Sequence, residues 1–169
     1  MHRCTQLTEM KKINWKKGLF SSKYRLFDNN IEVGEFSQSA FSSTSLGKIN
    51  EVKLRFKKKG LFSSETEITD LNSNQLIGNI KFNSWRNKAE IKISNKKYLW
   101  KYDNFWNSKW SISENGQQLI NYKSSTTSGN IESSIENDLL MLSGLYVYNY
   151  YVMMMIIIAA STTIIVSGN

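Results

Sequence analysis

The feature that most constrains this chain is a C-terminal run, Leu139 to Val166, that contains no charged side chain. As a helix, this run would be on the order of 45 Å long at about 1.5 Å per residue. That length is enough to cross a bilayer or to fill the interior of a closed β-structure. A helix that is apolar on all sides needs either lipid or protein around it. The rest of the sequence has to distinguish these two environments.

The residues before this run carry all of the side-chain charge. The chain has 169 residues and a formal net charge of +8, and no charged side chain follows Asp138. A chain of this length is expected to form one domain with a sizeable core. Its positive charge would draw the charged segment to anionic surfaces such as acidic lipid or nucleic acid. A basic, solvated surface without a ligand has the same composition.

The first residues exclude several kinds of site. One cysteine and one histidine are present, Cys4 and His2, so a disulfide framework and a His/Cys metal site are both excluded. Met1 to Lys17 has no apolar stretch of the kind found in secretory signal peptides, so we expect the chain to begin in the cytoplasm. Residues 1–12 have no clear periodicity and are expected to form a flexible leader before a barrel domain at 13–151.

Short β-favouring segments separated by turn residues fill the sequence up to the apolar run. Residues 51–57 alternate charged and apolar side chains, which places Val52, Leu54 and Phe56 on one face of a strand. About ten such segments and no helical periodicity predict a mainly β protein, an antiparallel sandwich or barrel of 10–12 short strands. Order is expected from Trp15, a loop at 37–47, and strands at 24–27, 31–36, 51–57, 65–71, 75–82, 88–93, 98–102, 110–113 and 118–122.

One heptapeptide occurs twice, as Lys16 to Ser22 and as Lys58 to Ser64. Each copy is followed by an expected strand, an Asn-rich turn and a second expected strand. Two copies are too few for a solenoid. The repeat indicates either one hairpin unit used twice in a meander or a chance similarity in a biased composition.

The entrance to the apolar run favours a protein environment for its first half. Ser133 and Glu136 have capping-box spacing, and Asp138 adds negative charge to the first turn, so we expect a helix from near Ser134. A cytoplasmic domain with a membrane anchor would be expected to carry Lys or Arg just before the span. The nearest upstream lysine is Lys123. Leu139 to Tyr151 also contains tyrosines, whose hydroxyl groups need partners.

The order of these motifs resembles the tubby C-terminal-like superfamily, which includes tubby domains, LURP-one-related proteins and phospholipid scramblases. Glu67 to Asp70 followed by Gln75 to Ile80 is similar to its units of strand, turn and glycine-containing strand. Asn137 to Tyr146 is similar to its closing helix, and the likeness covers Trp15 to Tyr151. The resemblance implies a closed antiparallel barrel around a hydrophobic helix at about 134–151, with these residues in the core: Leu139, Leu142, Gly144, Leu145 and Tyr146.

The resemblance also implies a partner. Tubby domains bind phosphoinositides through basic residues on the barrel surface, and scramblases act on lipid bilayers, so an anionic phospholipid or membrane surface is expected. No headgroup motif of the superfamily matches this sequence residue by residue. The candidate lipid contacts are the basic residues outside the apolar positions: Lys53, Arg55, Lys57, Lys58, Lys59, Lys81, Arg86 and Lys88.

The end of the chain departs from this pattern. A barrel of six-residue to eight-residue strands is on the order of 20 Å tall, and about fourteen to eighteen helical residues fill it. Residues 152–169 are therefore an apolar tail beyond the barrel. This tail would protrude, fold back as a strand, enter a membrane or contact a protein partner.

The sequence predicts a non-enzyme without cofactor or metal. It lacks a phosphate-binding glycine loop, paired metal ligands and a Ser/His/Asp set. Glu65, Glu67 and Asp70 lie close together, but the alternation indicates solvated charges. The aromatic stretch from Tyr98 to Trp110 suits a barrel core best, a lipid surface second and nucleic acid least. Trp85 to Lys88 is expected to be a loop, or else part of a headgroup site with Lys81.

Three hypotheses of function follow. The first is a non-catalytic barrel module bound to anionic phospholipid at the cytoplasmic face of a membrane. The second is a single-pass protein anchored by its C terminus, with Tyr146 to Val166 in the bilayer and a separate β-rich head. The third is an intracellular scaffold that binds a protein partner and no lipid.

Overall fold

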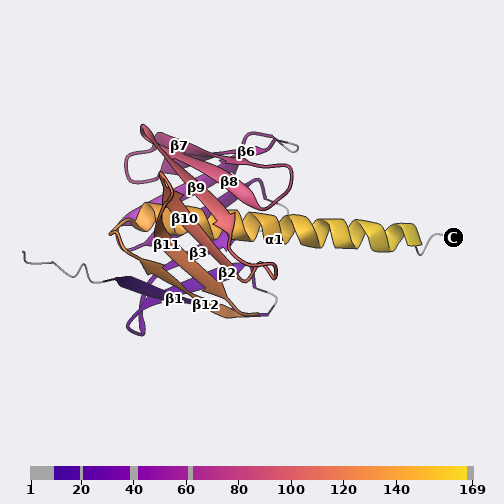
Figure 1. Ribbon diagram of the computed structural model, residues 1–169, viewed down its shortest axis with the longest axis horizontal. Coiled ribbons are helices and arrows are strands. Elements are labelled where there is room, and N and C mark those ends of the chain that lie inside the picture. Colours follow the sequence, from indigo (N-terminus) through magenta and orange to yellow (C-terminus); the bar gives the residue numbers. More distant parts are fainter. Residues whose placement is uncertain (1–9, 20, 39–41, 61–62, 167–169) are drawn as a thin grey trace, which may run out of the picture.

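The protein is a β-barrel threaded by one long helix (Figure 1). The computed structural model describes residues 10–19, 21–38, 42–60 and 63–166, with side chains up to Ala159. The helix starts at one end of the barrel, runs through its interior and continues well beyond the other end. It comprises 29 residues, α1 (Asp138–Val166).

The prediction of a closed antiparallel barrel around the C-terminal helix is confirmed. Each strand pairs with its neighbours in sequence, and the first strand closes the barrel against the last. Such a meander has no free sheet edge, which removes a common site of aggregation. The strands are β1 (Lys11–Lys17), β2 (Lys23–Asp28), β3 (Ile31–Gln38), β4 (Thr44–Ile49), β5 (Val52–Lys58), β6 (Glu65–Asp70), β7 (Gln75–Phe82), β8 (Lys88–Ile93), β9 (Lys96–Tyr102), β10 (Lys109–Glu114), β11 (Gln117–Ser124) and β12 (Ser128–Ser133).

Alternation along the strands builds the core. In β5, Leu54 and Phe56 are buried, whereas Lys53 and Lys57 between and beside them are exposed. The side chains that point inward surround the helix because successive residues of a strand face opposite sides. Left-handed backbone at short polar residues closes the turns between strands, as it tends to: positive φ angles occur at Asn29, Asn30, Asn50, Asn74 and Asn115.

Three sequence-based boundaries were wrong. The first strand begins at Lys11, inside the expected leader, whose residues 1–9 lie outside the described part of the chain. The loop expected at 37–47 contains the end of β3 and the start of β4. The helix begins at Asp138 rather than near Ser134, because Ser133 belongs to β12 and Asn137 forms the cap. The amide N–H of Leu140 donates to the Asn137 side-chain oxygen at 3.0 Å.

The first half of α1 makes specific polar contacts with the barrel wall. The hydroxyl groups of Tyr146 and Thr66 are 2.8 Å apart. Asn149 accepts a hydrogen bond from the Tyr24 hydroxyl at 2.8 Å and donates to the side-chain oxygen of Gln38 at 2.7 Å. Leu142, Gly144, Leu145 and Tyr146 are buried and Leu139 is half-buried. The interior therefore fixes both the depth and the rotation of the helix.

The two copies of the heptapeptide form the same connection. The first links β1 to β2 and the second links β5 to β6. In both, a serine N–H donates to a glycine carbonyl three residues earlier, Ser21 to Gly18 at 3.1 Å and Ser63 to Gly60 at 3.2 Å. The two connections thus share this hydrogen bond, and both lie at the end of the barrel where α1 leaves.

Candidate functional site

The two ends of the barrel differ in what they present. We call the end where α1 begins the entrance end; its turns are residues 29–30, 50–51, 71–74, 94–95, 115–116 and 134–137. We call the end where α1 leaves the exit end; there the chain passes from β1 to β2, β3 to β4, β5 to β6, β7 to β8, β9 to β10 and β11 to β12. Contacts of the helix define this polarity. Asp138 contacts Lys11 and Asn50 at the entrance, and Tyr151 contacts Asn83 and Lys88 at the exit.

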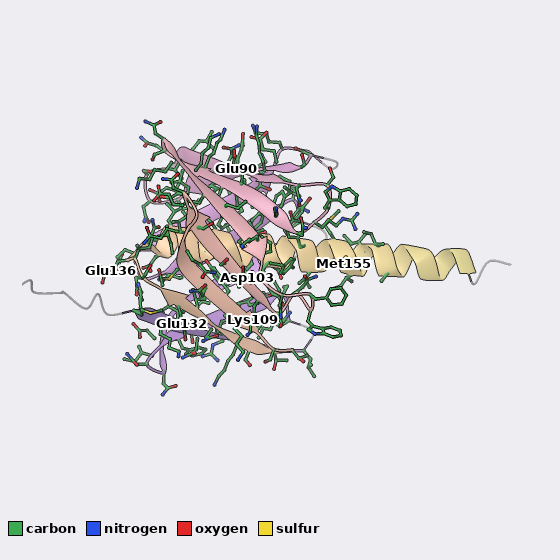
Figure 2. All side chains as sticks on the ribbon, in the orientation of Figure 1. Glu90, Asp103, Lys109, Glu132, Glu136 and Met155 are labelled. Carbon is green, nitrogen blue, oxygen red and sulfur yellow. The ribbon has the colours of Figure 1, made fainter. Side chains whose placement is uncertain are left out.

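Charge is distributed unequally between these ends. Among the turn residues and the residues at strand and helix ends on the entrance side, Lys11 and Lys96 are basic, but acidic residues predominate: Asp28, Glu51, Asp70, Glu114, Glu136 and Asp138. Figure 2 shows Glu136 beside the start of the helix. The exit end carries Glu65 and Asp103, but basic residues predominate: Lys17, Lys23, Lys58, Lys59, Arg86, Lys88 and Lys109. The barrel is therefore electrostatically polar along the helix axis.

Large apolar side chains are exposed on the exit connections. Trp85 is 87% exposed, Phe105 is 90% exposed and Trp106 is 82% exposed. Leu19, in the connection between β1 and β2, is exposed as well. The sequence placed Phe105 and Trp106 within a stretch best suited to the core. The structure puts Trp100 and Trp110 of that stretch in the core and leaves the two rings between them in solvent.

The two connections that carry these rings have the same local structure. The side-chain oxygen of Asn83 accepts hydrogen bonds from the N–H groups of Asn87 and Lys88, both at 3.1 Å. The side-chain oxygen of Asn104 likewise accepts from Ser108 and Lys109, both at 3.0 Å. An Asn side chain that binds backbone N–H groups ahead of it closes a compact loop. The enclosed apolar residues consequently point away from the barrel.

The second half of α1 projects from the middle of this end. By length and composition, Asp138–Ala159 could cross a membrane. However, 56% of its apolar 18-residue stretch is buried in the barrel. Burial ends within one turn after Tyr151, and Met155 and Ile156 are each 57% exposed. Figure 2 shows Met155 on the helix beyond the barrel.

The predicted lipid contacts do not form one surface. Lys53 lies toward the entrance end, paired across the sheet with Lys48. Arg55 is half-buried in the middle of β5. Lys57 and Lys88 are exposed near the exit end. Alternation showed that these residues would avoid the core, but it did not show at which end each would lie.

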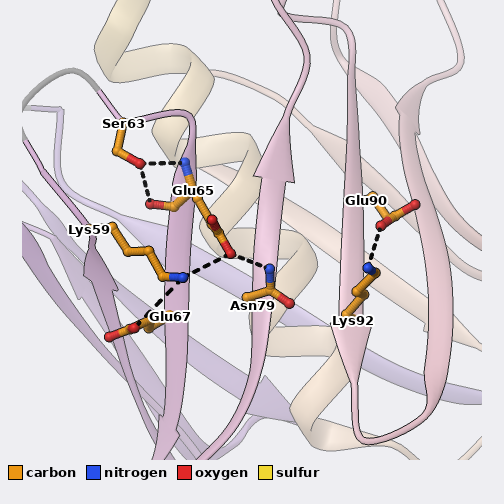
Figure 3. Close-up of polar contacts among 7 residues, drawn as sticks. All are labelled: Lys59, Ser63, Glu65, Glu67, Asn79, Glu90 and Lys92. Carbon is orange, nitrogen blue, oxygen red and sulfur yellow. Dashed lines mark hydrogen bonds and ion pairs between the residues drawn. The ribbon is translucent and has the colours of Figure 1, made fainter.

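Two further candidates, Lys59 and Lys81, have carboxylates as neighbours, and Figure 3 shows those of Lys59. The Lys59 ammonium is 3.1 Å from a Glu65 oxygen and 4.0 Å from a Glu67 oxygen. Lys81 lies between Glu65 and Glu90 on the neighbouring strands. The Lys59 side chain lowers the pKa of the Glu65 carboxyl by hydrogen bonding, and Lys81 lowers it further through its charge. The positive charges of both lysines are therefore partly compensated within the barrel wall.

The structure brings Lys58 and Arg86 together. Both line a cavity of about 280 Å³ at the exit end, although Lys58 ends β5 and Arg86 lies in the connection between β7 and β8. Sequence reasoning missed Lys17, Lys23 and Lys109, which also lie at this end. A signal was available, because alternate connections of an antiparallel meander lie at the same end of the barrel.

Among the residues that the structure describes, no three His, Cys, Asp or Glu side chains are placed to hold a metal ion. No protein-family model, curated protein sequence or solved structure matches the chain. The geometry of the exit end is therefore the basis for a functional conclusion.

Proposed function

We propose that this protein is a non-catalytic, membrane-attached barrel. Its exit end faces an anionic bilayer, and α1 enters the lipid from about Val152 onward. One observation carries the proposal: the apolar helix leaves the barrel through the end that also presents exposed aromatic rings and most of the uncompensated positive charge.

Each component of this end suits a different layer of a membrane. Tryptophan and other aromatic rings favour the boundary between headgroups and hydrocarbon, and the exposure of Trp85 and Trp106 at the exit end supports contact with that layer. Lysine and arginine near the surface are attracted to anionic lipid by about 1 kcal/mol each. From Val152 to Val166 the helix is about 22 Å long, a large part of a hydrocarbon core of about 30 Å. The acidic entrance end would point away from the bilayer.

The proposal combines two of the sequence-based hypotheses. Tyr146, Tyr150 and Tyr151 are buried in the barrel, so a separate head anchored from Tyr146 does not fit the structure. An anchor from Val152 does fit, and it holds the basic exit end against the headgroups. The likeness to the tubby C-terminal-like superfamily supports the proposal through the membrane roles that the likeness implies.

Vesicle flotation tests the proposal. The full chain should float with vesicles of phosphatidylcholine and phosphatidylserine, and alkaline carbonate should not extract it, because part of α1 lies in hydrocarbon. Binding before insertion should fall with added salt, since it depends on charge. Recovery of the wild-type protein in the carbonate supernatant would contradict the proposal. Capture of a stoichiometric protein partner without flotation would favour the scaffold hypothesis instead.

A matched pair of variants tests the orientation. Phe105→Ser with Trp106→Ser removes apolar contacts at the exit end and should weaken flotation several-fold, because each buried ring contributes about 1 kcal/mol or more. Ile31→Ser with Leu76→Ser removes exposed apolar side chains at the entrance end. That control should float like the wild type. Equal losses in both variants would contradict the proposed orientation.

A further inference from the structure

A cavity of about 280 Å³ lies at the exit end, against the side of α1. The connection between β5 and β6 and the connection between β7 and β8 form its outer walls, and Tyr150 and Met154 of α1 line its inner wall. Its volume is at the lower end of the range for small-molecule sites. The cavity therefore suits a small polar group rather than a drug-sized ligand, at the point where the helix leaves the barrel.

The charge of this cavity is positive and uncompensated. Lys58 and Arg86 line it, and no carboxylate does. Neither side chain forms an ion pair with any residue that the structure describes, in contrast to Lys59, which binds Glu65. The Lys58 ammonium lies 5.0 Å from the centroid of the Tyr150 ring. Burial lowers the pKa of Lys58, so part of its hydration has been lost without a negative partner in return.

Uncommitted hydrogen-bond donors converge on the same space. Ser64, Ser84 and Tyr150 line the cavity, and no hydrogen bond joins their hydroxyl groups to another residue that the structure describes. Two cations and several hydroxyl groups without an acidic neighbour are the donor set that binds a phosphate group. Pairs of Lys and Arg supply charge, and hydroxyl groups satisfy the remaining oxygens.

Another basic hollow serves as a comparison within the molecule. Lys16, Lys17, Lys23 and Arg25 line a cavity between β1 and β2. There, Lys23 binds Glu35 and Arg25 binds Glu32, so half of the positive charge already has a partner. The cavity beside α1 lacks such partners and is the stronger anion site.

We propose that the cavity between Lys58, Arg86 and Tyr150 binds the phosphate group of an anionic phospholipid headgroup. This inference rests on the proposed attachment to a membrane and names the ligand at that surface. Position favours a lipid over a free phosphate ion as the source. Met154 and Phe82 give the cavity an apolar side next to the helix that enters the bilayer, where the glycerol and first acyl carbons of a lipid would lie.

A titration of the full chain in dodecyl maltoside, a detergent without phosphate, tests the site. The probes are dihexanoyl phosphatidic acid and, in a separate arm, inorganic phosphate, and the readout is the backbone amide resonances of Ser84 and Arg86. The short-chain lipid should give saturable shifts at lower concentration than inorganic phosphate. Lys58→Gln with Arg86→Gln should weaken lipid binding about tenfold or more, as expected for lost charge-assisted hydrogen bonds.

Control variants make the outcome specific. Lys48→Gln with Lys53→Gln removes the same charge toward the entrance end and should bind the lipid like the wild type. Ser84→Asp places a negative charge in the exposed wall of the cavity and should abolish binding, which provides a second test that does not remove a basic residue. Absence of saturable shifts, or equal weakening in the control and the cavity variant, would overturn the inference. Equal affinity for inorganic phosphate would overturn the lipid assignment.

The outcomes separate this inference from the proposed function. If the wild-type protein floats with anionic vesicles but the short-chain lipid produces no saturable shifts, the cavity assignment is wrong and the membrane attachment stands. If the wild type does not float, the membrane attachment is wrong, and the assignment of a bilayer lipid to the cavity fails with it. Flotation together with lipid shifts that the cavity variants remove supports both.

Discussion

The two halves of helix α1 look alike in sequence but have opposite environments. Asp138 to Tyr151 passes through the barrel, where Gly144 packs against Tyr122 and Asn149 binds two wall residues. The part from Val152 onward emerges and exposes Met155 and its neighbours. Both parts are apolar, so hydropathy does not distinguish them. Small residues and polar groups with matching partners mark the half that protein surrounds.

Gly144→Asp should have the largest effect on stability. A β-carbon at this position would lie 2.2 Å from the Tyr122 hydroxyl oxygen and 2.9 Å from a carbon of Ile112. The substitution therefore creates an overlap and buries an unpaired carboxylate. We expect a loss of more than about 4 kcal/mol in the free energy of unfolding. Urea denaturation in dodecyl maltoside, followed by near-ultraviolet circular dichroism, measures it, and a cooperative transition like that of the wild type would contradict a packed inner half.

Asn149→Leu should have the next largest effect. The change leaves the Tyr24 hydroxyl and the Gln38 side chain without the partner that each now has at 2.8 and 2.7 Å. Each buried polar group left unpaired costs about 1–3 kcal/mol, so we expect a loss of about 2–4 kcal/mol in the same denaturation experiment. Met155→Leu is the control from the outer half and should change stability by less than about 0.5 kcal/mol. A loss for Asn149→Leu as small as that of the control would show that water can replace the network.

The barrel could be predicted from the sequence because apolar and charged side chains alternate along most strands. The prediction failed where residues that contact the helix break this alternation. Leu54 and Phe56 alternate with charged residues, so β5 could be recognised. In β4 the pattern is inverted, since Ser45 and Gly47 face inward and Leu46 is exposed. A β-carbon at Gly47 would be 3.0 Å from Leu142 of α1. Small inward residues make room for the helix, and they caused this strand to look like a loop.

The site was predictable in part. The sequence analysis included Lys58 only as one of the basic residues outside the apolar positions. In the structure Phe56 faces inward, and Lys58 occupies the next inward position at the rim of the barrel. Its position beside Arg86 depends on how strands β5 to β8 are arranged around the barrel, which the spacing of residues in the sequence does not show. The start of the helix was missed because Ser133 uses its hydroxyl in the turn after β12, where it accepts from the N–H of Ile135. Asn137 then caps the helix instead.

Alkaline pH should destabilise the barrel around the inner half of α1, because tyrosines buried in the barrel wall ionise there. Burial raises the pKa of Tyr24 and of Tyr122. Their contribution to stability is fully present below the unfolded pKa of about 10 and is lost as pH rises from there toward the folded pKa, because the unfolded chain releases its protons first. The free energy of unfolding should fall by up to about 1.4 kcal/mol per pH unit for each such tyrosine.

Tyr122→Phe isolates one of these groups. The hydroxyl of Tyr122 donates to the carbonyl groups of Leu140 and Met141, both at 3.2 Å. Its removal should lower the free energy of unfolding at neutral pH by about 1 kcal/mol. Above about pH 10, the free energy of unfolding should then fall less steeply with pH, by up to about 1.4 kcal/mol per pH unit. Urea denaturation at a series of pH values measures both slopes. Equal slopes in the variant and the wild type would mean that Tyr122 ionises as easily in the folded barrel as in the unfolded chain.

Met155→Asp should have the smallest effect on stability, although it introduces the same carboxylate as Gly144→Asp. Met155 is 57% exposed outside the barrel, so a charge there stays solvated in the absence of lipid and should change the free energy of unfolding by less than about 0.5 kcal/mol. Membrane attachment should respond in the opposite way, because a carboxylate on a lipid-facing helix costs up to about 2.5–3.5 kcal/mol and is repelled by anionic headgroups. Flotation and carbonate extraction should therefore give different results for variants on the two sides of Val152. Met155→Asp should fold but fail to attach to vesicles, whereas Gly144→Asp should not fold. If Met155→Asp instead unfolded the protein as Gly144→Asp does, the outer half of α1 would have to pack against the barrel rather than insert into the bilayer.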